Sequence, residues 1–311
     1  MKIISSHQAF PSSTPRVATI GFFDGVHLGH RFLIDQVKKI SKKEGLKSAV
    51  ITFPSHPLQT LKESFKPQLL TTYDEKIELL SQTGIDDCIV LDFTKQLSNY
   101  SAEQFMKDIL KEQYNIKYLV IGHDHHFGHN QNETIEDYER YGKSLDIAVS
   151  NVPPYLLNSN IISSSAIRQL LSDGNVSSAA KELGYAYTIN GTVVKGEQIG
   201  RTIGFPTANL SINDEDKLIP KGGVYAVKVH IDNNQYYGML NIGVRPTVSD
   251  NNHTTIEVFI LHFNTDIYQK KMRISFIQRI RSEIKFANIE DLKAQLTKDC
   301  EAVERIEEGK N

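Results

Sequence analysis

The stretch GFFDGVHLGH, residues 21–30, decides how this chain is organised. An apolar run, 17–20, leads into it, and an amphipathic helical pattern leaves it. The start of a helix offers unpaired N–H groups and a positive dipole end, which favour an anion such as phosphate. Glycines let a backbone approach such a ligand closely. We therefore predict a nucleotide-phosphate site that includes Phe23, Asp24, Gly25 and Gly29.

Two histidines, His27 and His30, stand in this turn with one residue and a glycine between them. Two imidazoles at a helix start can meet the charge that develops on an α-phosphate as it becomes five-coordinate. The spacing resembles the signature of the adenylyl- and cytidylyltransferase superfamily, which releases pyrophosphate without a covalent enzyme intermediate. The alternative is that both are ordinary polar residues of a turn, since a short motif is only a hypothesis.

Length and composition predict a globular protein of about two domains. The chain has 311 residues, of which 40% are hydrophobic and 23% are charged, and its formal net charge is −2. This balance argues against a nucleic-acid partner or an anionic membrane surface, because such binders usually carry a basic excess. Small anionic ligands need only a local basic group, so the net charge does not exclude them.

The cysteines and the N-terminus predict a cytoplasmic location. Cys88 and Cys300 lie far apart without the spacing of a metal site, so we expect reduced, buried residues. Residues 1–6 lack the long apolar segment of a signal peptide. No run approaches the roughly 18 apolar residues that a membrane span requires. We expect no membrane segment, and the sequence leaves the oligomeric state unknown.

Strand-like apolar runs alternate with helical patterns through the first half. The expected strands are Val17–Ile20, Ser48–Phe53, Cys88–Phe93, Tyr118–Ile121 and Ile147–Val152. Helices are expected after His27, over 73–83 and from a capping box at Ser101. The alternation predicts a Rossmann-like α/β domain, with a parallel sheet between helices and ligands beyond the carboxyl ends of the strands.

The fourth expected strand ends in GHDHHFGH, residues 122–129. A metal site is one interpretation of these histidines. In an extended segment, however, His125 and His126 would point to opposite faces, and no cysteine or second acidic residue completes a ligand set. We favour a strand-end loop that faces the nucleotide, with Asp124 and Phe127 as candidate contacts.

A serine cluster, Ser163, Ser164 and Ser165, precedes a short helical pattern that carries Arg168. The simplest interpretation is a helix N-cap and a surface arginine. Because the chain also carries the two histidines, we favour a functional interpretation. In it, the serine hydroxyls and the N–H groups bind phosphates, and Arg168 pairs with the leaving pyrophosphate. A second short helix follows, and we place the domain boundary after it, giving domains 1–184 and 185–311.

The second half changes to short β-type runs, which predict a small antiparallel barrel with a closing helix over 289–306. The expected strands are Tyr187–Val194, Gly223–Ile231, Gln235–Ile242, Thr255–Phe263 and Met272–Ile280. The stretch GRTIGFPTAN, 200–209, places Thr207 and Asn209 two residues apart, with oxygen ligands suited to Mg²⁺. Glu257 is an isolated acid in an apolar strand; it is either solvent-facing or, in a pocket, a general base.

Three stretches in this order, 23–30, 162–168 and 200–209, resemble the bacterial bifunctional riboflavin kinase/FAD synthetase family. The resemblance implies that the barrel transfers the γ-phosphoryl group of ATP to riboflavin, giving FMN, with Glu257 as catalytic base. The N-terminal domain would then transfer AMP from a second ATP to FMN, giving FAD and pyrophosphate. The implied site residues are His27 and His30 for transfer, Ser164 and Arg168 for phosphate, Thr207 and Asn209 for Mg-nucleotide, and the loop residues Gly200, Arg201, Gly204 and Pro206.

The chain departs from the family at two points. Ser165 stands where threonine is common, and His125 stands where the family loop has an aromatic residue. Two rival hypotheses remain. A nucleotidyltransferase for pantetheine- or nicotinamide-type acceptors would leave the barrel unexplained. A non-catalytic flavin sensor would be marked by loss of His30 or Glu257, and both are present.

Overall fold

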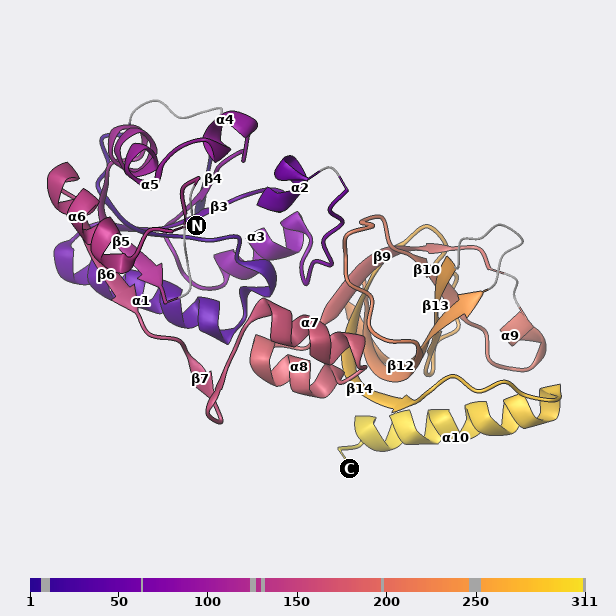
Figure 1. The fold of residues 1–311 in the computed structure, drawn as a ribbon. Coiled ribbons are helices and arrows are strands. Elements are labelled where there is room, and N and C mark those ends of the chain that lie inside the picture. Colours follow the sequence, from indigo (N-terminus) through magenta and orange to yellow (C-terminus); the bar gives the residue numbers. More distant parts are fainter. Residues whose placement is uncertain are drawn as a thin grey trace. The chain divides into compact units, whose positions relative to one another are not determined.

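Two compact units make up the chain, residues 1–164 and 165–311, and each is described by itself (Figure 1). The computed structural model describes residues 1–6, 12–62, 64–123, 127–129, 132–196, 199–245 and 253–309. In that part of the chain, no helix is long and apolar enough to cross a membrane. Asp124, a predicted nucleotide contact, lies outside the described residues, as does His125.

The first unit is built on a six-stranded parallel sheet with strand order β1-β4-β3-β2-β5-β6. The prediction of a parallel sheet is confirmed. β1 was not predicted, because it is a short edge strand whose Ile3 is exposed. A two-stranded hairpin, β7 (Leu156–Leu157) and β8 (Asn160–Ile161), follows the sheet. The sheet strands are β1 (Lys2–Ser5), β2 (Arg16–Ile20), β3 (Lys47–Thr52), β4 (Asp87–Val90), β5 (Ile116–Gly122) and β6 (Ala148–Val152).

Helices cover both faces of this sheet, as the alternation predicted. Because successive side chains of a strand point to opposite faces, Val17 packs with α1 and α3, whereas Ala18 packs with the helices of the other face. Gly45 ends α1 with a φ of 67°, and Ser101 and Gln104 form the predicted capping box. The helices are α1 (Leu28–Glu44), α2 (Pro57–Leu61), α3 (Tyr73–Ser81), α4 (Lys95–Ser98), α5 (Ala102–Gln104), a π-helical segment (Phe105–Gln113) and α6 (Ile135–Leu145).

The second unit contains a closed antiparallel barrel with strand order β10-β13-β12-β11-β14-β9. The predicted barrel is confirmed, and a turn at Asp232 joins β11 to β12 in an antiparallel hairpin. β10 was not predicted, because it lies inside the glycine-rich motif. The strands are β9 (Thr188–Val194), β10 (Ala208–Ser211), β11 (Gly223–Ile231), β12 (Asn234–Arg245), β13 (His253–Ile260) and β14 (Lys271–Arg281).

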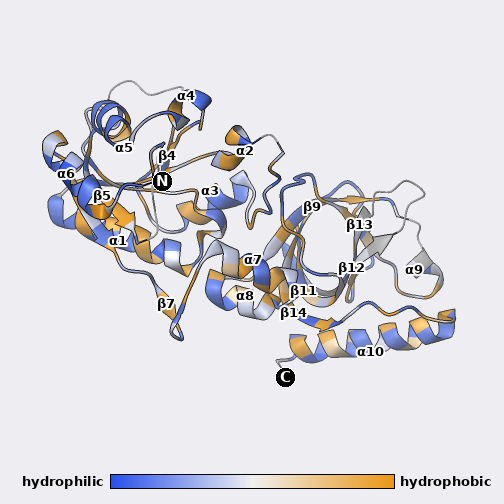
Figure 2. Cartoon of the chain, in the orientation of Figure 1, coloured by the Kyte–Doolittle hydropathy of each residue, from blue (hydrophilic) through white to orange (hydrophobic). Residues whose placement is uncertain are grey.

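Four helices complete the second unit: α7 (Ser164–Ser172), α8 (Val176–Leu183), α9 (Ile199–Thr202) and α10 (Ile289–Glu307). α10 is amphipathic (Figure 2), and its Val303 is buried on the outer face of the barrel, in a cluster with Val224 and Met239. α8 packs against β14, so α7 and α8 group with the barrel and not with the first unit. The domain boundary after Gly184 stays a prediction.

Candidate active sites

The turn after β2 has a backbone that most residues avoid. Phe23, Gly25 and Val26 have φ values of 56°, 79° and 37°, so three of four consecutive residues lie in or near the left-handed region. Glycine adopts this conformation without a steric penalty, which explains Gly25. The surrounding structure must hold the other two residues in place, and such strain is common at functional sites.

Asp24 is the anchor of this turn. It is 3% exposed, and its carboxylate accepts hydrogen bonds from the backbone N–H groups of Leu70 and Thr71 at 2.9 and 3.1 Å. The Gly25 N–H donates to Thr71 Oγ1 at 3.1 Å, and Ser164 Oγ donates to the Asp24 carbonyl at 3.0 Å. Asp24 was predicted as a nucleotide contact, but its carboxylate is turned toward the protein.

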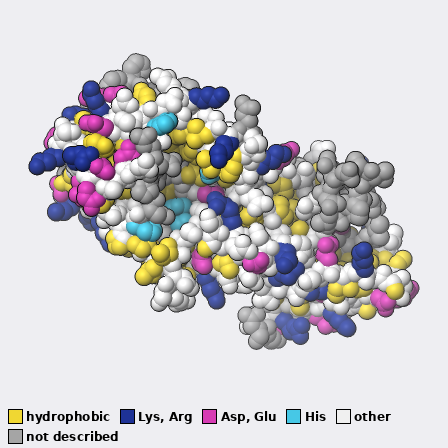
Figure 3. All heavy atoms as spheres, in the orientation of Figure 1, with side chains coloured by type: hydrophobic (Ala, Val, Ile, Leu, Met, Phe, Trp, Pro, Cys, Tyr) yellow, Lys and Arg dark blue, Asp and Glu magenta, His cyan; other side chains and the backbone are white. Residues whose placement is uncertain are grey.

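His27 and His30 lie together at the start of α1. His27 is the N-cap, and its Nδ1 accepts the His30 backbone N–H at 3.3 Å. The two rings are stacked, with centroids 3.6 Å apart and planes 18° from parallel. A Cβ at Gly29 would stand 3.1 Å from the His27 ring, so glycine leaves room for this stack. Histidine side chains gather on one face of the first unit (Figure 3).

The stacked rings have a chemical consequence. Because His27 Nδ1 accepts a hydrogen bond, any proton on a neutral ring sits on Nε2, which then serves as a donor. Two positive charges at this separation would repel each other, and an anion beside both rings would offset that repulsion. Phe23 is buried, and its ring packs edge-on against the His30 ring, with the two centroids 5.2 Å apart. This contact restricts the orientation of the His30 ring.

The other predicted residues of the first site fall into different places. Ser164 lies against the turn through its bond to Asp24, and the exposed Ser165 follows it at the start of α7. Arg168 lies on α7, in the second unit, and Ser163 directly precedes the helix. Phe127 is buried, stacked on Tyr138 at 4.4 Å, so its ring serves the core.

In the barrel, strand register brings the predicted residues together. Glu257 of β13 pairs with Asn209 of β10 on one side and with Asn241 of β12 on the other. Thr207 Oγ1 donates to Glu257 Oε2 at 3.2 Å. Directly paired residues share a face of a sheet, so one row of polar side chains crosses three strands.

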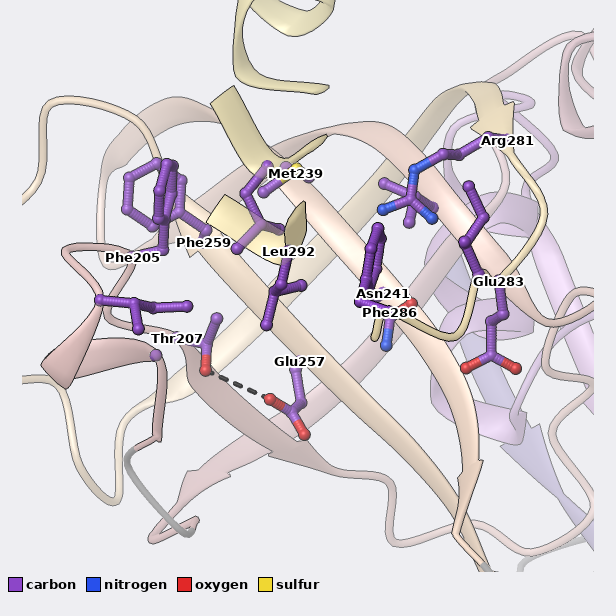
Figure 4. A pocket seen from close by; sticks show the side chains of 15 residues that line it. Phe205, Thr207, Met239, Asn241, Glu257, Phe259, Arg281, Glu283, Phe286 and Leu292 are labelled. Atoms are coloured by element: carbon purple, nitrogen blue, oxygen red, sulfur yellow. Dashed lines mark hydrogen bonds between the residues drawn. The ribbon is translucent and has the colours of Figure 1, made fainter. Parts of the chain in front are cut away.

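Thr207, Asn241 and Glu257 line a cavity of about 270 Å³ (Figure 4), whereas Asn209 is not among its lining residues. Ile256 and Val258 are buried, so alternation turns Glu257 to the outer face of the barrel, beneath α10. Glu257 therefore faces a pocket. The sequence left open whether it faces solvent or a pocket, and the structure shows the second orientation. The remaining lining is mostly apolar: Ile203, Phe205, Val224, Met239, Phe259, Ile284, Phe286, Leu292 and Leu296, with Gly200, Thr207, Asn241, Arg281 and Glu283.

The predicted loop residues divide between the pocket and the surface. Gly200 lines the pocket, and its carbonyl accepts the Phe205 N–H at 2.8 Å, which closes the loop. Arg201, Gly204 and Pro206 are exposed and do not line the pocket. Their predicted role in nucleotide binding stays a prediction.

Sequence reasoning missed the residues that form the far side of the pocket. Asn241, Arg281, Glu283 and Phe286 were not among the predicted site residues. The sequence predicts that Asn241 lies in a strand, but only the observed register places it opposite Glu257. Arg281 and Phe286 carry no local signal, because a strand end and the loop before α10 bring them to the pocket.

Comparison with known proteins agrees with this two-part architecture. The family model described as FAD synthetase matches residues 10–166, and the one described as riboflavin kinase matches residues 183–307. A bifunctional riboflavin kinase/FMN adenylyltransferase of Listeria monocytogenes is 40% identical over 91% of this chain and 90% of its own length. One of Buchnera aphidicola is 36% identical over 98% of both chains.

A solved structure shares the whole fold. The crystal structure named as a macrolide-efflux protein from Streptococcus pneumoniae superimposes with a TM-score of 0.88 and 33% identity, covering 98% of this chain and 99% of that one. The transport activity in its name belongs to that protein's description. On the two family models and the full-length relatives, the chain belongs to the family of bifunctional riboflavin kinase/FMN adenylyltransferases.

Proposed function

We propose that this chain carries out two consecutive transfers from ATP, phosphorylation of riboflavin to FMN by the barrel and adenylation of FMN to FAD by the first unit. The matches of both family models and the names of the relatives support this. The observation that carries the proposal is that each unit has its own reactive pair: stacked His27 and His30 in one, hydrogen-bonded Thr207 and Glu257 in the other.

In the kinase step, Glu257 is the general base. The terminal ribityl hydroxyl oxygen of riboflavin attacks the γ-phosphorus, its proton passes to the Glu257 carboxylate, and ADP departs with the electrons of the broken P–O bond. The apolar side chains that line the pocket, among them Phe259 and Leu296, provide a surface for the flavin ring. Thr207 holds Glu257 in place through the 3.2 Å hydrogen bond.

Thr207 and Asn209 fit a Mg²⁺–nucleotide complex. Both offer oxygen ligands, and a Cβ at Gly196 would clash with the Asn209 amide, so this amide packs directly against the Gly196 backbone. Glu257 brings a carboxylate to the same row. Mg²⁺ would neutralise charge on the ATP phosphates when bound there. Removing it with a chelator should stop FMN formation.

In the adenylyl-transfer step, a phosphate oxygen of FMN attacks the α-phosphorus of ATP, and pyrophosphate leaves. His27 and His30 donate hydrogen bonds to the α-phosphate oxygens as negative charge grows there. The start of α1 adds backbone N–H groups and its positive dipole end. Ser164 already touches the turn and, with Arg168, is proposed to bind the departing pyrophosphate.

The test is a time course of the purified chain with riboflavin, ATP and Mg²⁺, followed by chromatography of the flavins. FMN should appear first and FAD second. If FMN accumulates and no FAD forms, FMN is not the acceptor of the first unit. The first unit would then be a nucleotidyltransferase with another acceptor. Unchanged riboflavin with tight flavin binding would favour the sensor hypothesis. A cytoplasmic location and the absence of a nucleic-acid partner stay predictions.

A further inference from the structure

Lys76 is a buried lysine directly behind the first site. It lies on α3 and is 2% exposed, although a lysine is almost never fully buried without a partner. Its Nζ donates to the carbonyl of Phe53 at 2.7 Å and stands 3.9 Å from the centre of the Phe22 ring. The ammonium thus makes a hydrogen bond and a cation–π contact at once.

The two contacts belong to neighbouring strand ends. Phe22 lies in the turn after β2, one residue before the strained segment that leads to His27. Phe53 directly follows β3, and Thr52 Oγ1 donates to the Phe22 carbonyl at 3.1 Å. One ammonium therefore ties the backbone after β3 to the ring that opens the histidine turn.

The charge on Lys76 is finely balanced. Burial lowers its pKa to about 8, and the nearby Asp24 carboxylate opposes that decrease. Cys88 of β4 also faces it, but burial raises the pKa of that thiol to about 12, so the thiol is neutral at pH 7. Asp24, itself an anchor of the turn, is thus the charged group that keeps the lysine protonated.

We propose that Lys76 is a positioning residue for adenylyl transfer, whose ammonium holds the strand-end segments after β2 and β3 so that His27 and His30 meet the α-phosphate. The inference rests on the proposed adenylyl-transfer role of this turn. Lys76 acts through Phe22 and the Phe53 carbonyl, and its contact with the reaction is indirect. Because misplacement by about 1 Å costs on the order of 100-fold in rate, the interaction matters for catalysis.

The experiment compares the Lys76→Met and Lys76→Arg variants of the full chain. Methionine keeps the stem but removes the charge and the donor, whereas arginine keeps the charge at every usable pH. The kcat and KM for FMN adenylation are measured from pH 6.5 to 9.5. Riboflavin phosphorylation by the same molecules is the internal control, and Lys43→Met, at a side chain 82% exposed, is the matched control.

For Lys76→Met we expect kcat of FMN adenylation to fall about 10- to 100-fold, with KM within about threefold, as for a lost transition-state interaction. Riboflavin phosphorylation and Lys43→Met should match the parent. In the parent, kcat should fall as the pH rises through about 8 and the ammonium loses its proton. Lys76→Arg should remove this decline while keeping a measurable rate.

Three results would overturn the inference: parent kcat in Lys76→Met, an equal decline above pH 8 in parent and Lys76→Arg, or equal losses of both activities in Lys76→Met. The His30→Ala variant separates this failure from that of the proposed function. If His30→Ala still makes FAD at the parent rate, the turn is not the transfer site at all. If only Lys76→Met keeps the parent rate, the site stands and the positioning role fails.

Discussion

The two candidate sites are assembled in opposite ways. In the first unit, His27 and His30 lie three residues apart, and the turn that holds them is encoded in ten consecutive residues. In the barrel, the pocket is lined by side chains from β11, β12, β13, the end of β14 and α10, and from the loop before β10. Thr207 and Glu257, which form a hydrogen bond there, are fifty residues apart in the sequence. A local motif defines the first site, and strand register defines the second.

This contrast predicts different vulnerabilities. The first site depends on a strained turn that its neighbours must hold in place, through Asp24 and Lys76. The second depends on the barrel closing in one register with α10 fastened over it, because a one-residue slip would turn Glu257 to the other face. Substitutions can test each dependence, and each unit's activity serves as the control for the other.

The largest effect should follow Glu257→Ala. Loss of a general base costs about 10²- to 10⁴-fold in rate, so riboflavin phosphorylation should fall by that factor. Supplied FMN should still be converted to FAD, because the first unit is intact. Rates of both steps by chromatography are the measurement, with Glu215→Gln, at an exposed loop position, as the control. Phosphorylation at the parent rate would remove Glu257 from the mechanism.

Asp299→Ala tests the fastening of α10. Asp299 is 1% exposed and accepts hydrogen bonds from Arg281, at 2.6 Å from Nη2, and from Gln295 at 2.9 Å. Leaving the partly buried Arg281, whose side chain is 16% exposed, without its carboxylate should cost about 1–3 kcal/mol of barrel stability. Because Arg281 lines the pocket, phosphorylation should be lost at a lower urea concentration than adenylation.

Urea unfolding followed by both activity assays measures this difference. Asp35→Ala is the control, since its ion pair with Lys38 is exposed and such pairs contribute about 0–1 kcal/mol. If the two activities of Asp299→Ala disappear together with a parent-like midpoint, the pair does not hold α10 in place.

His30→Ala comes next. Removing one donor to developing charge costs about 10²- to 10³-fold, so FAD formation should slow by that factor while FMN accumulates. Lys39→Ala, at an exposed position of α1, is the control substitution and should leave both rates unchanged. An undiminished rate of FAD formation in His30→Ala would contradict the assignment of the turn.

The same contrast explains what the sequence alone could predict. The parallel sheet, the barrel and the histidine turn were predicted, because alternation, glycine stops and a short motif are local signals. Asn241, Arg281 and Phe286 were missed as pocket residues, because their meeting depends on strand register and on the chain returning to the barrel after β14. Lys76 looks like an ordinary residue of a helix until the packing is known.

Asp24 shows a second limit of the sequence. Asp24 was interpreted as a ligand contact, and that stays a prediction; the motif did not reveal that its carboxylate accepts hydrogen bonds from the N–H groups of Leu70 and Thr71. A motif identifies which residues a turn requires, but not whether a given side chain serves the ligand or the turn itself. Only the partners, which lie far along the chain, separate the two roles.

The smallest effect should come from Thr207, and it sharpens the account of the barrel site. Thr207→Val keeps the shape but removes the hydroxyl that donates to Glu257. A hydrogen bond to a charged group contributes about 1.5–3 kcal/mol, or roughly 10- to 150-fold. Phosphorylation should fall within that range, below the loss in Glu257→Ala. Thr207→Ser should recover most of the rate, because the hydroxyl returns.

The double variant Thr207→Val/Glu257→Ala separates two roles of this hydroxyl. If Thr207 acts only by orienting Glu257, removing it from a chain that already lacks the base should change the phosphorylation rate little. If it also holds the nucleotide with Asn209, the double variant should be slower than Glu257→Ala and its KM for ATP should rise. We expect the second result, because Thr207 lies two residues before Asn209, which pairs with Glu257 across β10 and β13, so the hydroxyl and the amide can reach one nucleotide.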